Sequence, residues 1–310
     1  MYQSFYGLDR PPFAATPEPG ALFLSPQHQK ALSMLRLALM ARGGFCVVTG
    51  EVGAGKTTLV RRLLQEVDED VHVGLVSNTQ CESFVEFLQW VLLAFDLDYR
   101  SKSKVELYDD FISFLIFQFQ RGQPVTLIID EAQHLGPQYL EQLRMLSNVN
   151  TERGEVLQTI LVGQPQLWDL LRQPELEQFA QRITYDCFLG PLESPELTRA
   201  YIDHRIGFAN GDPAIFADET IETIWRASRG VPRLINLICN TALVYGYAEE
   251  KPTIDLMLIE QVLEEKATSF APLDSMAGGS PRGQSGNKRS TERDARNSTI
   301  ERAVARKDQQ

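Results

Sequence analysis

The sequence predicts an α/β fold built on a parallel β-sheet, with a smaller all-helical region after it. Up to about residue 190, short apolar runs alternate with helix-length amphipathic segments, which is typical of parallel strands covered on both faces. A glycine-rich stretch, Gly50 to Thr57, joins one such run to a helical segment. Between residues 191 and 268, apolar residues recur only at helical spacing.

The predicted strands are apolar runs of four to seven residues that are rich in β-branched side chains, which favour extended structure. They span residues 45–49, 71–76, 125–129, 159–162 and 183–189.

The predicted helices show apolar side chains three and four positions apart, as on one face of a helix. In the second region, prolines such as Pro195 and Pro232 mark helix starts, because proline suits the first helical turn. The helices span residues 27–42, 59–67, 82–95 and 107–119, then 195–209, 218–228, 232–249 and 255–267.

The charge of the chain is unevenly distributed. The net charge of −11 divides into −15 for residues 1–274, with 22 basic and 37 acidic residues, and +4 for residues 275–310. Such an acidic body disfavours a broad footprint on nucleic-acid phosphates. No secretory signal or membrane-length apolar stretch is visible, so we expect a cytoplasmic, soluble protein. The expected division is 1–190, 191–268 and a disordered basic tail, 269–310, too poor in apolar residues to fold.

The glycine-rich stretch has the sequence GEVGAGKT and follows a predicted strand, as a phosphate-binding loop does. Its glycines let backbone N–H groups turn toward a phosphate. Lys56 would reach the terminal phosphate oxygens, and the Thr57 hydroxyl would bind Mg²⁺. The predicted nucleotide-binding residues are Gly50, Glu51, Val52, Gly53, Ala54, Gly55, Lys56, Thr57 and Thr58.

Two carboxylates, Asp130 and Glu131, end the apolar run 125–129. Opposite a phosphate loop, such a pair serves nucleoside triphosphate hydrolysis. We expect Asp130 to bind Mg²⁺ together with Thr57, and Glu131 to polarise the attacking water.

At this point the chain resembles the AAA+ ATPases, which combine a P-loop αβα core with a helical lid. Within them it is similar to the ExeA/GspA family of secretion-associated ATPases, including MshM-type proteins of pilus biogenesis. The resemblance covers roughly residues 1–268 and rests on ordered motifs. These are Tyr2-x-x-Phe5-x-Gly7-Leu8 with Pro12-Phe13, Leu24-Ser25-Pro26-x-His28, GEVGAGKTT, LIIDEAQHL, ILVGQPQL, LEQFAQRI and GVPRLIN.

The resemblance implies roles for three further polar residues. Gln164 follows the strand 159–162 at the position of the sensor-1 residue, and Arg233 resembles the sensor-2 arginine of the lid. Arg182 stands where relatives place an arginine finger that reaches the nucleotide of the neighbouring subunit, with Arg172 as the alternative. A finger of this kind neutralises charge on the transferring phosphoryl group.

The resemblance also places His28, Tyr2, Phe5 and Gly7 around the adenine, although an aromatic N-terminal segment that packs on the core fits the sequence almost as well. The long relatives continue into a membrane span and a periplasmic peptidoglycan-binding part. This chain ends in a polar tail, so any membrane link is expected to run through a partner.

The function expected from these features is ATP binding and Mg²⁺-dependent hydrolysis by a homo-oligomer that supports assembly of a secretion or pilus system. A DNA-associated AAA+ regulator of the transposition type, using the basic tail, is the alternative. A nucleotide-gated scaffold that hardly turns over is a third reading, against which the full set of Lys56, Thr57, Asp130 and Glu131 weighs.

Overall fold

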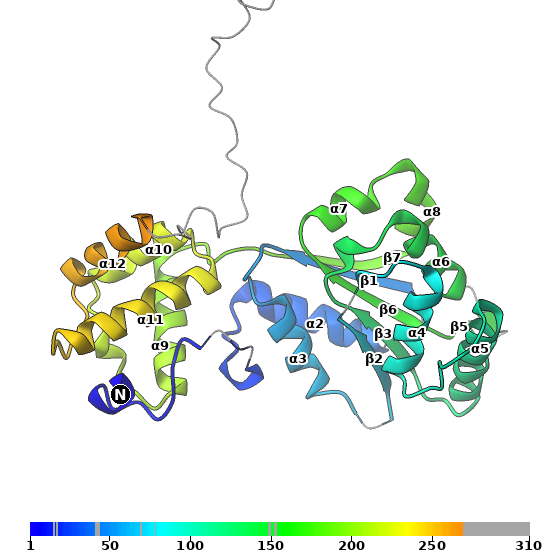
Figure 1. The fold of residues 1–310 in the computed structure, drawn as a ribbon, viewed down its shortest axis with the longest axis horizontal. Coiled ribbons are helices and arrows are strands. Elements are labelled where there is room, and N and C mark those ends of the chain that lie inside the picture. Colours follow the sequence, from blue (N-terminus) through cyan, green and yellow to red (C-terminus); the bar gives the residue numbers. More distant parts are fainter. Residues whose placement is uncertain are drawn as a thin grey trace, which may run out of the picture. The chain divides into compact units, whose positions relative to one another are not determined.

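A five-stranded parallel β-sheet forms the centre of residues 44–189 (Figure 1). The computed structural model describes residues 1–268 except 15, 17, 41–43, 69, 78, 148–149 and 152–153. The strand order is β2-β3-β6-β1-β7, with every neighbouring pair parallel. The strands are β1 (Gly44–Gly50), β2 (His72–Val76), β3 (Val125–Ile129), β6 (Gln158–Gly163) and β7 (Ile183–Leu189). The predicted parallel sheet is therefore confirmed.

The strand register determines where the site forms. Thr49 of β1 pairs with Gly163 of β6, and Ile129 of β3 pairs with Leu161 on the other side of β6. The carboxyl ends of these three strands thus lie side by side, as parallel pairing requires. Residues that follow β1, β3 and β6 therefore meet at the carboxyl ends of the strands, with the residue after β6 in the middle.

Helices cover both faces of the sheet (Figure 1). On one face, α2 and α3 pack over Cys46, Val48 and Ile160. On the other, helices α4 to α8 bury Phe45, Val47 and Leu127. The helices of these two layers are α2 (Pro26–Met40), α3 (Lys56–Leu64), α4 (Phe84–Ala94), α5 (Lys104–Gln120), α6 (Pro137–Ser147), α7 (Gln166–Leu171) and α8 (Glu177–Ala180).

Two features of this part differ from the expectation. The edge strand β7 alternates between half-buried and exposed residues up to Phe188, because successive side chains point to opposite faces of the sheet and those on one face of this strand are left exposed. Helix α6 was not among the predicted helices, and neither was the short hairpin of β4 (Asn150–Thr151) and β5 (Gly154–Glu155).

Four longer helices form the second region, as predicted. A serine caps the first of them: the hydroxyl of Ser194 accepts a hydrogen bond from the Leu197 N–H. Their buried aliphatic side chains form a separate core, which Tyr6, Leu8 and Phe13 from the N-terminal segment join. The helices are α9 (Pro195–Phe208), α10 (Thr220–Ser228), α11 (Pro232–Ala248) and α12 (Leu256–Thr268), with α1 (Tyr2–Phe5) beside them.

The first thirteen residues thus share a core with the helical region, although the expected division at residue 190 groups them with the sheet. That division otherwise stays a prediction. The tail, 269–310, lies outside the described residues. Within the described part of the chain, no helix combines the length and the apolar character needed to cross a bilayer.

Candidate functional site

The loop between β1 and α3 has the backbone of a phosphate-binding loop. Gly53 and Gly55 adopt φ angles of 83° and 97°, in the left-handed region that glycine enters without steric cost. Gly55 immediately precedes α3, so the loop leads into the positive end of a nine-residue helix. This is the geometry in which backbone N–H groups bind phosphate.

Lys56 is almost wholly buried at the start of α3, with 7% of its surface exposed. Its Nζ donates hydrogen bonds to the carbonyl oxygens of Gly50, at 2.9 Å, and Glu51, at 3.0 Å. Burial lowers the pKa of Lys56, while the carboxylates of Glu131, Asp130 and Glu51 oppose the shift. A cation held only by neutral carbonyls is well prepared to exchange them for phosphate oxygens.

Thr57 and Asp130 meet directly, although they are far apart in the sequence. The Thr57 hydroxyl donates to Asp130 Oδ2 at 2.9 Å, and the Glu131 N–H donates to Asp130 Oδ1, also at 2.9 Å. Asp130 is 6% exposed. A hydroxyl and a carboxylate form the hard-oxygen set that Mg²⁺ prefers, so these two residues fit the ion that the motif implies.

Glu131 lies beside this pair with a left-handed backbone, φ 53°. Its Oε2 accepts hydrogen bonds from Gln133 Nε2 at 2.6 Å and from Gln164 Nε2 at 3.2 Å. Burial favours the neutral acid, but these two hydrogen bonds, with Lys56 and His134, hold the pKa of Glu131 below its ordinary value. These surroundings therefore favour the ionised form of Glu131.

His28, near the start of α2, contacts the phosphate-binding loop. Its Nε2 lies 2.9 Å from the Ala54 carbonyl oxygen, and its Nδ1 lies 2.7 Å from Ser25 Oγ. A carbonyl only accepts, so Nε2 carries the proton and the neutral Nδ1 accepts from the serine hydroxyl. Burial lowers the pKa of His28, against the Ala54 hydrogen bond. The hydrogen bond between His28 and Ala54 thus holds the loop against helix α2.

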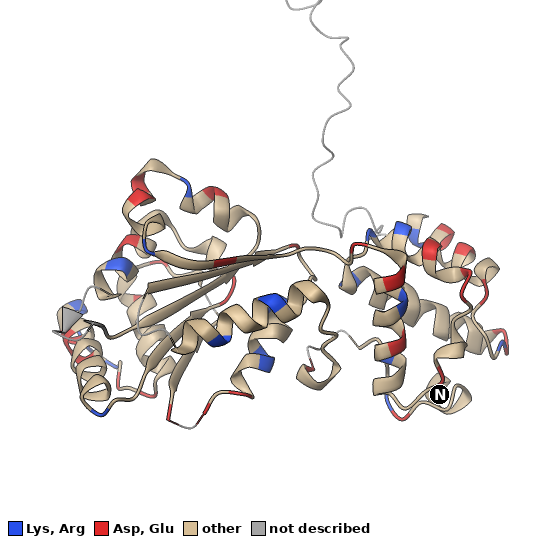
Figure 2. Cartoon of the chain, turned by 180° about the vertical axis from the view of Figure 1, so that it is seen from behind, with Lys and Arg blue, Asp and Glu red and all other residues tan. Residues whose placement is uncertain are grey.

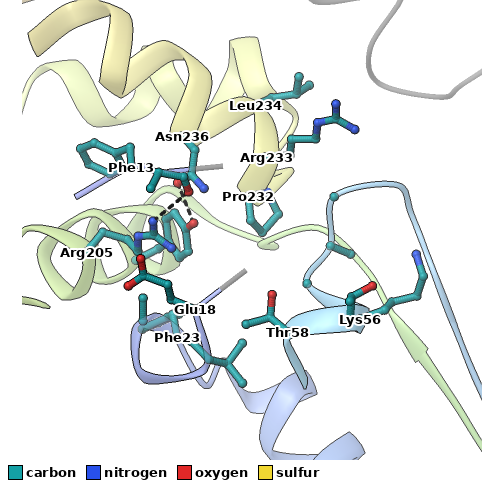
Figure 3. A pocket seen from close by; sticks show the side chains of 18 of the residues that line it. Phe13, Glu18, Phe23, Lys56, Thr58, Arg205, Pro232, Arg233, Leu234 and Asn236 are labelled. Atoms are coloured by element: carbon teal, nitrogen blue, oxygen red, sulfur yellow. Dashed lines mark hydrogen bonds between the residues drawn. The ribbon is translucent and has the colours of Figure 1, made fainter. Parts of the chain in front are cut away.

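Most of these residues line one pocket, which has a volume of about 650 Å³, although Gly50, Glu51 and Asp130 are not part of its lining. Pro232 and Arg233 at the start of α11 face Lys56 and Thr58 across it (Figure 3). The contact is close, because the Arg233 N–H donates to the Gly53 carbonyl at 3.3 Å. Every predicted site residue from Val52 to Thr58 lines this pocket, as do His28, Glu131, Gln164 and Arg233.

The far end of the pocket is aromatic and polar. Phe13, Phe23, Arg205 and Asn236 line it (Figure 3). Tyr201 also belongs to the lining of the pocket. The sequence analysis assigned none of them to the nucleotide site, although Phe13 belongs to a quoted motif, since nothing in the spacing links Phe13 to a helix that begins near residue 195. Room for an apolar, flat group beside the phosphate end suits a nucleotide base.

Tyr2, Phe5 and Gly7, which were expected around the adenine, do not line this pocket. The alternative of packing is correct, but the packing is on the helical region. Tyr2 donates through its hydroxyl to Asn240 Oδ1 of α11 at 3.1 Å, and α1 lies against α11.

Neither candidate arginine finger lies in this pocket. Arg182 precedes β7 at the amino ends of the strands, where its carbonyl oxygen accepts a hydrogen bond from the Phe45 N–H. Its Nη1 donates to Ser147 Oγ of α6 at 3.0 Å. Arg172, at the end of α7, has its guanidinium over the Trp168 ring, 5.7 Å from the centroid.

Comparison with known proteins agrees with this geometry. A family model described as an AAA domain matches residues 40–171. General secretion pathway protein A of Aeromonas hydrophila is 40% identical over 249 residues, which are 80% of this chain and 45% of that protein. The chain thus spans less than half the length of this relative.

Solved structures share the fold at low identity. The ORC2 protein of Aeropyrum pernix, in its ADPNP–ADP complexes, matches with a TM-score of 0.64 and 16% identity, over 83% of this chain and 72% of that chain. Cdc6p from Pyrobaculum aerophilum gives 0.61 and 15%, over 82% and 70%. The RuvB Holliday junction branch migration motor of Thermotoga maritima gives 0.53 and 16%, over 78% and 69%.

The parallel sheet with its phosphate loop, acidic pair and helical extension defines the chain as an AAA+ ATPase. Within that class it is ExeA-like, because its sequence is similar to that of general secretion pathway protein A.

Proposed function

We propose that the chain binds ATP with Mg²⁺ in the pocket between the loop and α11, and hydrolyses it there. The observation that carries the proposal is the convergence of Lys56, the Thr57–Asp130 pair and Glu131 at one edge of the sheet. Phosphoryl transfer needs these parts together, since catalysis is mainly positioning and charge neutralisation.

Each residue has a distinct part in this proposal. Lys56 and the N–H groups of the loop bind the phosphates, and Arg233 approaches them from α11. Thr57 and Asp130 hold Mg²⁺, which supplies neutralisation of phosphate charge when bound. Glu131 accepts a proton from the attacking water, and Gln164 lies between it and the phosphates.

The test compares Glu131→Gln with Lys56→Ala in Mg²⁺-dependent phosphate release and nucleotide binding. Glu131→Gln should lower kcat at least about 100-fold, as loss of a general base does, while binding persists. Lys56→Ala should abolish binding. Glu260→Gln, at an exposed position of α12, is the matched control. Wild-type turnover rates in Glu131→Gln would refute the proposed mechanism.

We further propose a homo-oligomer in which Arg182, or else Arg172, acts on the nucleotide of the next subunit. Their position outside the pocket of their own chain supports this reading. The specific activity should then rise with protein concentration, and Arg182→Ala should remove that rise. A flat profile rejects action in trans.

The proposed setting is assembly of a secretion or pilus system on the cytoplasmic side of the inner membrane, reached through a membrane partner. The name of the similar relative supports secretion. The alternative, a DNA-associated regulator, rests on the basic residues of 275–310. Against it, residues 191–268 carry thirteen acidic and seven basic residues, and acidic positions occur along these helices (Figure 2).

The rate of ATP hydrolysis with and without double-stranded DNA at low salt separates the two settings. We expect no stimulation. Strong stimulation that disappears when residues 275–310 are deleted would favour the DNA-associated regulator and reject the secretion setting.

A further inference from the structure

Gln133 holds the carboxylate of Glu131 from within the same turn. It lies in the short 3-10 helix Ala132–His134 that follows Glu131. Its Nε2 donates to Glu131 Oε2 at 2.6 Å, and Gln164 donates to that same oxygen. Within the described part of the chain, the other carboxylate oxygen, Glu131 Oε1, accepts no hydrogen bond. One carboxylate oxygen is thus held by two amides, and the other is available to accept a proton.

The other end of the Gln133 amide is held as well. Its Oε1 accepts from the Gln164 backbone N–H at 2.9 Å. Because an N–H can only donate, this contact fixes which end of the amide faces Glu131. Gly163 leaves room for the arrangement, since a Cβ atom there would lie 2.8 Å from Gln133 Oε1. Gln133 therefore links the ends of β3 and β6.

The backbone of Glu131 is fixed separately. A left-handed φ is sterically unfavourable for a residue with a Cβ, and such a conformation persists only where its surroundings hold it. Asp130 Oδ1 accepts from the Glu131 N–H, and the Thr79 hydroxyl donates to the Glu131 carbonyl at 3.0 Å. With the backbone fixed, the direction of the carboxylate depends on Gln133 and Gln164.

We propose that Gln133 is a positioning residue for hydrolysis, which orients Glu131 so that its second oxygen takes the proton of the attacking water. The inference rests on the proposed function, because it presumes that Glu131 is the base. A carboxamide suits this task, since it donates a hydrogen bond and neither carries charge nor competes for the proton. Gln133 itself touches no reacting atom.

The test is Gln133→Met, which keeps the length of the side chain and removes both hydrogen bonds. Loss of a group that orients a functional residue typically costs 10- to 100-fold, so kcat should fall by about that factor. KM and the dissociation constant of ADP should stay within about twofold. Gln138→Met, at an exposed position of α6, is the matched control and should leave kcat, KM and the dissociation constant of ADP unchanged.

A double variant separates positioning from a purely structural role. In a Glu131→Gln background, Gln133→Met should lower the residual rate no further, whereas a general loosening of the site would lower it equally in both backgrounds. Gln133→Glu guards against misfolding, because it keeps the shape and the acceptor for the Gln164 N–H. It replaces the donor by a carboxylate that repels Glu131, so kcat should again fall. An unchanged or raised kcat in either single variant overturns the inference. Wild-type rates in Glu131→Gln alone overturn the proposed function instead.

Discussion

Replacing His28 by leucine tests whether helix α2 braces the phosphate loop through this side chain. His28 is 4% exposed and bonds both Ser25 and Ala54. Leucine fills much of the space but leaves the Ala54 carbonyl and the Ser25 hydroxyl without this partner. A buried polar group without its partner costs about 1–3 kcal/mol. The free energy of unfolding at pH 7.5 should therefore fall by about 2–4 kcal/mol.

The same substitution has a predicted pH dependence. The folded-state pKa of His28 lies below its usual 6.5, so the unfolded chain binds the extra proton. The stability that neutral His28 contributes is complete above pH 6.5 and is lost as the pH falls toward the folded-state pKa. One proton changes stability by at most about 1.4 kcal/mol per pH unit. The difference in the free energy of unfolding between wild type and His28→Leu should therefore become smaller as the pH falls from 6.5 to 5.5.

Chemical denaturation at pH 7.5, 6.5 and 5.5 provides the measurement. His134→Leu, at an exposed position, is the control for removing any imidazole. A stability difference that is small at pH 7.5, or that stays constant over this range, would refute the account of His28 as a buried neutral brace.

Two further predictions concern the contacts between the helical region and the loop segments. Gly53→Ala should lower the affinity for ADP, measured by calorimetry, at least about tenfold. The φ of 83° at position 53 costs a residue with a Cβ about 1–2 kcal/mol, and the new Cβ would lie 2.4 Å from Arg233 Cβ. Unchanged affinity would contradict the tight packing of α11 on the loop. Arg205→Met should lower the free energy of unfolding by about 2–4 kcal/mol, since Arg205 is 9% exposed and donates to the Pro12 and Ala14 carbonyls. Arg226→Met, at an exposed ion pair with Glu222, should cost less than about 1 kcal/mol, and equal losses would refute the reasoning.

The sequence alone predicts most elements of this fold, because their signals are local. All five strands of the main sheet and the four long helices of the second region occur where the apolar pattern predicts them. Helix α6 and the hairpin β4–β5 lack so clear a pattern. The exposure of alternate side chains along β7 was not predicted, since a run of residues does not reveal whether its strand lies at a sheet edge.

The chemistry of the site was likewise local in its main parts. The motif from Gly50 to Thr57 and the pair Asp130–Glu131 carry their residue types and spacing in the chain itself, and the structure brings Thr57 within 2.9 Å of Asp130. Their catalytic roles stay predictions until the variants are measured.

Tertiary structure alone decided the surroundings of these residues. The order β3-β6-β1 places Gln164 between the acidic pair and the loop, and only then does Gln133 have two partners. The helical region likewise takes the N-terminal aromatic residues into its own core and brings Phe13 to the pocket. The sequence determines which groups the chain has and the local backbone that presents them. Which groups meet depends on long-range packing, because contacts between distant residues leave no periodic signal in the chain.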